Sequence, residues 1–150
     1  MKTENELFHK VAAAMAGCQR VEQYLKLYIN EAYDFAKECI DGRMPFHFSG
    51  KIVENHALER LIEVFKMMTD DPELVRELRR FKDERNFLSH TAITHCYDYG
   101  GEFSDCTAKD LEPRLIEIEK NAELLVDQIH QHHGRLLVER HFENLEDTTQ

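Results

Sequence analysis

The residues best suited to chemistry lie in one run near the middle of the chain, Glu84-Arg85-Asn86-Phe87-Leu88-Ser89-His90. Arg85 falls within a stripe of apolar residues that recur every three or four positions, as on one face of a helix: Leu74, Leu78, Phe81, Leu88 and Ala92. An arginine does not lose its charge, so a guanidinium on such a stripe must pair with a carboxylate or face a wet cleft. The run therefore predicts either an ion pair or a charged binding site.

A second stripe on the same segment has the same spacing but no apolar member: Arg76, Arg79, Asp83, Asn86 and His90. The segment is locally basic although the whole chain has a formal net charge of −10. An acidic chain argues against nonspecific nucleic-acid binding over its whole surface, but it permits one local basic cleft. The simpler interpretation is a structural arginine beside a solvated polar face.

The chain before this run is expected to form two helices. Residues 5–40 contain little glycine and no proline, which is typical of one long helix or of two helices with a bend near Gly17. The apolar stripe of this segment runs from Phe8 to Cys39. A second helix is predicted over about residues 55–69.

Glu22 lies on the apolar stripe of the first helix. A carboxylate and a guanidinium that both fall on core-facing stripes of a small protein are expected to pair. Glu22 is therefore the first candidate for a structural pair with Arg85.

The helix that carries the central run is predicted to begin at Asp71-Pro72. Asp71 suits the N-cap, and Pro72 suits the first helical position because its missing N–H is not needed there. A fourth helix is predicted to begin at Pro113. The sequence thus predicts a single all-α domain over residues 1–150, an antiparallel bundle of four main helices with a disordered tail from about residue 143.

Arg85 and His90 do not share a face on a straight helix. Five residues correspond to a rotation of about 140° at about 100° per residue, whereas Asn86 and His90 are neighbours. For Arg85 and His90 to act on one group, Arg85 must reach sideways, the helix must distort near Ser89, or a partner subunit must complete the site.

The sequence Arg85-Asn86-Phe87-Leu88-Ser89-His90 resembles the Arg-x-x-x-x-His signature of HEPN domains, including the polar residue that commonly follows the arginine. Its position late in the third helix of a small all-α chain fits that family. The resemblance implies a HEPN-like bundle that forms a homodimer, with the two motif helices facing each other across a cleft. For active members it implies metal-independent endoribonuclease activity, in which the ribose 2′-hydroxyl attacks the adjacent phosphodiester, without a cofactor.

The resemblance also implies roles for individual residues. His90 would be the general acid or base, because imidazole titrates near neutral pH. Arg85 would bind the scissile phosphate, and Asn86 would position the phosphate or the imidazole. RNA, and not DNA, would be held by the neighbouring cations Arg76, Arg79 and Lys82. Such proteins are often toxins of toxin–antitoxin or phage-defence systems, commonly with a nucleotidyltransferase-type antitoxin as partner.

A different class of function fits the same residues. In this alternative the chain is a non-catalytic, homodimeric interaction module that binds a protein or nucleotide partner. Arg85 and Glu22 would then be only a structural pair, and the surface of the motif helix would dock the partner.

Other candidate sites are less well defined. His130 and His133 have a spacing that could place both on one helix face near His132, and Asp127 or His141 could assist them as metal ligands. Nothing fixes a third ligand, however, so no metal site is predicted and a solvated polar patch is the favoured interpretation. The four cysteines lack paired spacing and are expected to be free thiols.

The location of the protein is expected to be cytoplasmic. The sequence has no run of about 18 apolar residues that could span a membrane. Its N-terminal residues are polar and acidic and contain no apolar core of a signal peptide. No membrane partner is therefore expected.

Overall fold

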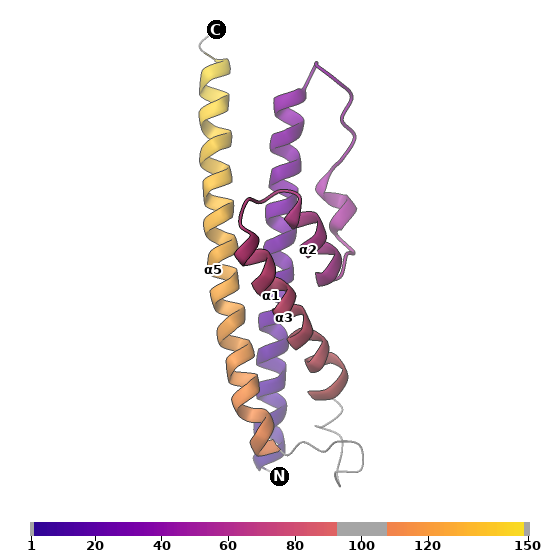
Figure 1. Cartoon of the computed structure of the whole chain (residues 1–150), viewed down its shortest axis with the longest axis vertical. Helices are drawn as coiled ribbons and strands as arrows, with labels where there is room; N and C mark the ends of the chain where they lie inside the picture. Colours follow the sequence, from indigo (N-terminus) through magenta and orange to yellow (C-terminus); the bar gives the residue numbers. More distant parts are fainter. Residues whose placement is uncertain (1, 93–107, 149–150) are drawn as a thin grey trace.

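The computed structural model of the chain describes residues 2–92 and 108–148. Its elements, in order, are α1 (Lys2–Ile40), the 3-10 turn η1 (Gly50–Val53), α2 (Leu58–Lys66), α3 (Pro72–Phe87), the π-helical turn η2 (Leu88–Ala92) and α5 (Ala108–Asp147). The described residues contain no strand, and the predicted all-α bundle of four main helices is confirmed (Figure 1). Within these residues, no helix combines the length and apolar character that crossing a membrane requires.

The two longest helices, α1 and α5, are parallel (Figure 1). Lys10 pairs with Glu112, and Glu38 pairs with Arg140; in both cases the partners are 102 positions apart. A constant offset along two helices means that they run in the same direction. The contacts of α3 have the opposite trend, because its N-cap Asp71 meets His132 whereas Glu84 near its end meets Arg114. The predicted antiparallel arrangement thus holds for α3 against α5 but not for α1 against α5.

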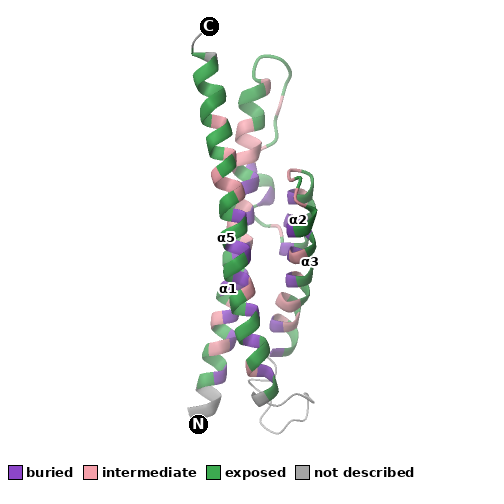
Figure 2. Ribbon diagram, turned by 60° about the vertical axis from the view of Figure 1, so that its left-hand side comes forward, coloured by how far each residue is buried: buried purple, intermediate pink, exposed green. Residues whose placement is uncertain are grey.

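The α2–α3 hairpin covers only part of the α1–α5 pair. The 39 residues of α1 and the 40 residues of α5 each correspond to a length of about 60 Å, whereas the 16 residues of α3 correspond to about 24 Å. Buried residues are concentrated where α2 and α3 lie on the long helices, and the C-terminal ends of α1 and α5 are mostly exposed (Figure 2). The molecule therefore has a packed body and a two-helix arm.

Gly17 lies at a close approach of α1 and α5. It is buried, and a Cβ atom at this position would be 2.9 Å from the Cβ atom of Ala122. The predicted alternative of a bend near Gly17 is wrong, because α1 is one continuous helix. The absence of a side chain here allows the two helices to meet.

Gly17→Leu is expected to destabilise the fold by about 1–3 kcal/mol or more, the usual cost of overpacking, because the new side chain must separate α1 from α5. Urea denaturation followed by circular dichroism measures the change. Gly134→Ala is the matched control: a Cβ atom there meets nothing within 4 Å. It should stabilise α5 by about 0.5–1 kcal/mol. Equal stability of Gly17→Leu and the wild type would contradict the close approach.

Helix α5 is longer at both ends than predicted. It begins at Ala108 and contains Pro113 in its interior, so the prediction that the helix starts at Pro113 is wrong. Burial of Leu111 explains the difference, since it anchors the turn that precedes the proline. The helix also continues to Asp147 beyond the predicted start of a disordered tail at about residue 143. Ion pairs from Arg140 to two carboxylates of α1 hold this end in place.

Candidate functional site

Arg85, on the last turn of α3, forms an ion pair with Glu22 of α1. Its Nε atom lies 3.5 Å from Oε1 of Glu22, so the pairing predicted from the sequence is present in the structure. The Arg85 side chain is 36% exposed and the Glu22 side chain 16%. Arg85 therefore contacts Glu22 through one nitrogen and still reaches solvent.

A small pocket of about 90 Å³ lies beside this pair. Arg85, Glu22, Cys18 and Ser89 contribute to its wall. Burial raises the pKa of Cys18 to about 12, and the nearby charge of Glu22 acts in the same direction. A thiol with this pKa stays protonated at neutral pH, so Cys18 is not an active nucleophile. The charged side chains that line this pocket are those of Arg85 and Glu22.

The helix changes geometry three residues after Arg85. Residues Leu88–Ala92 form a π turn, and the Ser89 hydroxyl donates a 3.1 Å hydrogen bond to the Arg85 carbonyl. A serine that bonds four residues back in this way often bends a helix, and π turns occur frequently at functional sites. A distortion near Ser89, one of the three ways in which Arg85 and His90 could act on one group, is thus present. A π turn has more residues per turn than an α-helix, so it reduces the rotation between Arg85 and His90 below the straight-helix value of about 140°.

His90 and Asn86 lie outside the Arg85 pocket. Both are exposed to solvent, and neither contributes to the pocket wall. Within one chain the structure therefore brings Arg85 together with Glu22, and not with His90. A substrate that contacts both Arg85 and His90 must lie across the outer surface of the π turn.

The three cations predicted to hold RNA are each paired with a carboxylate. Arg79 lies 2.9 Å from Glu63, and Lys82 lies 3.8 Å from Glu59. Both of these carboxylates belong to α2. Arg76 pairs with Glu73 on its own helix. The local positive charge of α3 is therefore largely balanced within the fold, and RNA could use these cations only in competition with their carboxylates.

The histidine cluster of α5 has mostly packing contacts. His130 meets the ring of Tyr24 edge-on, with 6.0 Å between the ring centroids, and the Nε2 atom of His133 is buried without a hydrogen-bond partner. Among the residues that the structure describes, no group of three or more His, Cys, Asp or Glu side chains is arranged to hold a metal ion. The cluster thus gives no evidence for a metal centre.

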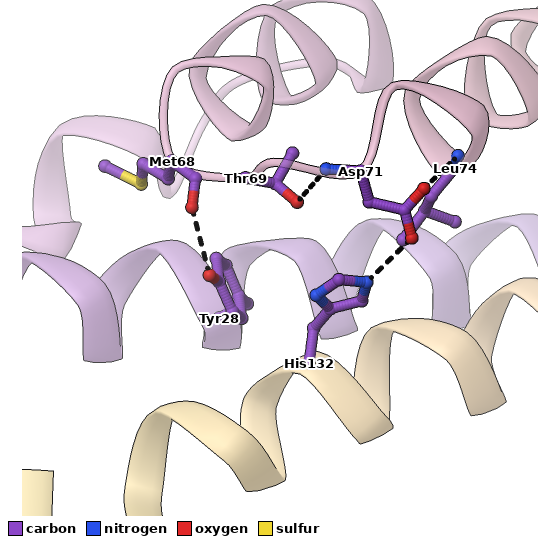
Figure 3. A network of polar contacts seen from close by, with 6 residues as sticks. All are labelled: Tyr28, Met68, Thr69, Asp71, Leu74 and His132. Atoms are coloured by element: carbon purple, nitrogen blue, oxygen red, sulfur yellow. Dashed lines mark hydrogen bonds and ion pairs between the residues drawn. The ribbon is translucent and has the colours of Figure 1, made fainter. Parts of the chain in front are cut away.

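His132 joins all four helices of the body, a role that the sequence analysis missed. Its Nε2 lies 3.1 Å from Oδ2 of Asp71, and its ring lies beside that of Tyr28 (Figure 3). The His132 ring also meets the Phe65 ring edge-on. Asp71 also accepts the Leu74 N–H at 3.0 Å, which confirms it as the N-cap of α3. A signal was present, since His132 continues the buried series of Leu125 and Ile129 at helical spacing.

Asp71→Ala is expected to destabilise the fold by about 0.5–2 kcal/mol at pH 7, the usual effect of losing an N-cap. The Leu74 N–H and the His132 hydrogen bond hold the pKa of Asp71 below its ordinary value. The stabilisation is therefore present above the unfolded-state pKa of about 3.9 and is lost as the pH falls through the lower folded-state pKa.

Denaturation at pH 7 and near pH 3 measures this dependence. The difference between wild type and Asp71→Ala should shrink at the lower pH. Asp70→Ala is the control, because the Asp70 side chain is exposed, lies next to Asp71 in the sequence and does not cap α3. A difference that stays constant between the two pH values would contradict the role of the Asp71 carboxylate.

Comparisons with protein-family models, curated proteins and solved structures find no match to this chain. The resemblance to HEPN domains therefore rests on residues 85–90 and on the helix that carries them. The functional conclusion depends on the geometry of this site.

Proposed function

We propose that the chain is a metal-independent endoribonuclease of the HEPN type, and that it acts in a toxin–antitoxin or phage-defence system. The observation that carries the proposal is the placement of Arg85. This side chain forms an ion pair at Nε with Glu22, is exposed enough to meet a ligand, and lies three residues before a π turn that carries His90. Such a fixed guanidinium suits a phosphodiester better than a purely structural role.

The proposed reaction is transesterification within the RNA. The 2′-oxygen attacks the adjacent phosphorus while a base removes the hydroxyl proton, and the bond from phosphorus to the 5′-oxygen breaks as that oxygen gains a proton. The products are a 2′,3′-cyclic phosphate and a 5′-hydroxyl. His90 transfers protons, Arg85 neutralises charge on the non-bridging oxygens, and Asn86 orients the phosphate or the imidazole.

In the homodimer that the HEPN resemblance implies, the partner subunit adds a second copy of the motif. Two copies of His90 could then divide the roles of base and acid. An antitoxin of the nucleotidyltransferase type is the proposed regulatory partner.

A second candidate function is favoured by the paired cations of α3. Arg76, Arg79 and Lys82 each have a carboxylate partner, which weakens the case for an RNA-binding surface. If these pairs persist, the chain is better described as a non-catalytic module whose motif helix binds a protein or nucleotide.

The experiment that separates the two functions is incubation of the purified chain with a mixed RNA pool in EDTA, followed by analysis of the product ends. The proposal expects cleavage that leaves 2′,3′-cyclic phosphates. A folded protein that leaves the RNA intact would favour the interaction module, and cleavage that EDTA abolishes would indicate a metal-dependent nuclease.

A further inference from the structure

Helix α1 contributes two polar side chains, Gln19 and Glu22, to the pocket beside Arg85. They are three positions apart in the sequence, so they are neighbours on one face of the helix. Met15 and Leu88 give the same pocket an apolar part of its wall. Its volume of about 90 Å³ is far below the range of about 300–1,000 Å³ that is usual for ligand pockets. The pocket is therefore suited to one edge of a larger molecule.

The charges in this pocket cancel. Among the described residues that line it, Arg85 carries one positive charge and Glu22 one negative charge, and the others are uncharged. A phosphate group inside the pocket would meet the carboxylate as well as the guanidinium, and like charges repel. An uncharged hydrogen-bonding group is better suited to the pocket. The phosphate can contact Arg85 from outside, across the π turn.

The two side chains from α1 have hydrogen-bonding capacity that the described part of the chain does not use. Oε1 of Glu22 forms an ion pair with Nε of Arg85 at 3.5 Å, and no described residue donates a hydrogen bond to this carboxylate. The Gln19 side chain is exposed, and its amide has no hydrogen-bond partner among the described residues. A carboxylate can accept two N–H groups, and an amide nitrogen can donate to a carbonyl oxygen.

We infer that Glu22 and Gln19 read a guanine base of the RNA, next to the phosphate that Arg85 contacts. The Watson–Crick edge of guanine presents two donors side by side, N1–H and N2–H, followed by the acceptor O6. The two donors suit the Glu22 carboxylate, and O6 suits the amide nitrogen of Gln19. The inference rests on the proposed function, because the base is read as part of an RNA substrate.

The other three bases fit these two side chains less well. Adenine and cytosine each present one amino donor beside a ring nitrogen that accepts. Uracil presents a single N–H between two carbonyl oxygens. None of them gives the Glu22 carboxylate two adjacent donors, so guanine should be preferred.

The base at the cleavage site is the first test. When the products from the mixed RNA pool are sequenced, guanine should be enriched at one of the two positions that flank the broken bond. In a defined RNA, replacing that guanine by inosine, which lacks the 2-amino group, should lower kcat/KM by about tenfold or more, the usual effect of losing a hydrogen bond to a charged group.

Variants of the pocket show whether these side chains carry the preference. Glu22→Gln and Gln19→Ala should each reduce the ratio of kcat/KM for guanine over the other bases, by about tenfold for Glu22→Gln. Gln23→Ala is the matched control, because Gln23 is also an exposed glutamine of α1 but does not line the pocket. It should leave the ratio unchanged. If Glu22→Gln and Gln19→Ala lower cleavage at all bases equally, the side chains do not read the base and the inference is overturned.

Binding of guanosine 3′-monophosphate separates this inference from the ribonuclease activity, because it requires no cleavage. Titration calorimetry in EDTA should give a dissociation constant about tenfold lower for this nucleotide than for the inosine and adenosine 3′-monophosphates. Selective guanosine binding without RNA cleavage would support the base pocket and overturn the ribonuclease. RNA cleavage without base preference, or equal binding of the three nucleotides, would overturn the base pocket alone. A chain that binds none of them and cleaves no RNA overturns both.

Discussion

His90→Ala is expected to reduce RNA cleavage by about 10²–10⁴-fold, the range that a positioned general acid or base contributes. The fold should remain intact, because His90 is exposed and lies outside the apolar core. The measurement combines the cleavage rate of a defined RNA with the thermal midpoint of unfolding. A large loss of rate at an unchanged midpoint would assign His90 to the chemistry.

His47→Ala is the matched control for this prediction. His47 is also exposed, but it lies between α1 and η1, away from the motif. Its replacement should change neither the cleavage rate nor the thermal midpoint. If His90→Ala cleaves as fast as the wild type, the ribonuclease activity does not belong to this motif.

Phe65→Ala should destabilise the fold by about 3–5 kcal/mol, the range for deleting a buried aromatic side chain. Phe65 is fully buried at the junction of the four helices, where its ring meets those of Tyr28 and His132. At about 2–4 °C per kcal/mol for a chain of this size, the thermal midpoint should fall by about 10 °C.

The control for Phe65→Ala is Met67→Ala, two residues further along the same helical turn. Met67 is 76% exposed, so its loss should change the free energy of unfolding by no more than about 0.5 kcal/mol. Urea denaturation of the two variants measures both values. Equal effects would mean that Phe65 is not at the centre of the core.

Local patterns in the sequence were sufficient to predict much of this fold. The capping of α3 by Asp71, the apolar stripes and the Arg85–Glu22 pair depend on residue type and spacing, and the structure contains all three. Spacing does not reveal where a stripe stops being covered, however. Cys39 continues the stripe of α1 but is exposed, because the covering helices α2 and α3 are much shorter than α1.

The candidate site was less predictable because it depends on long-range arrangement. Local charge suggested an RNA-binding role for Arg79, but Glu63 from α2 reaches it only once the hairpin has formed. His132 looked like one of several clustered histidines, and its link to Asp71 depends on how α5 lies against α3. The parallel direction of α1 and α5 is likewise a property of the connections and not of either helix.

The parallel direction of α1 and α5 also determines how the molecule would respond to mechanical force. The chain begins at one end of α1 and finishes at the opposite end of α5 (Figure 1). Pulling on the two termini would therefore load the α1–α5 contact in shear, so that the Lys10–Glu112 pair, the Gly17–Ala122 contact and the Arg140 pairs resist together. A chain with antiparallel terminal helices would instead open like a zipper, one contact at a time and at lower force.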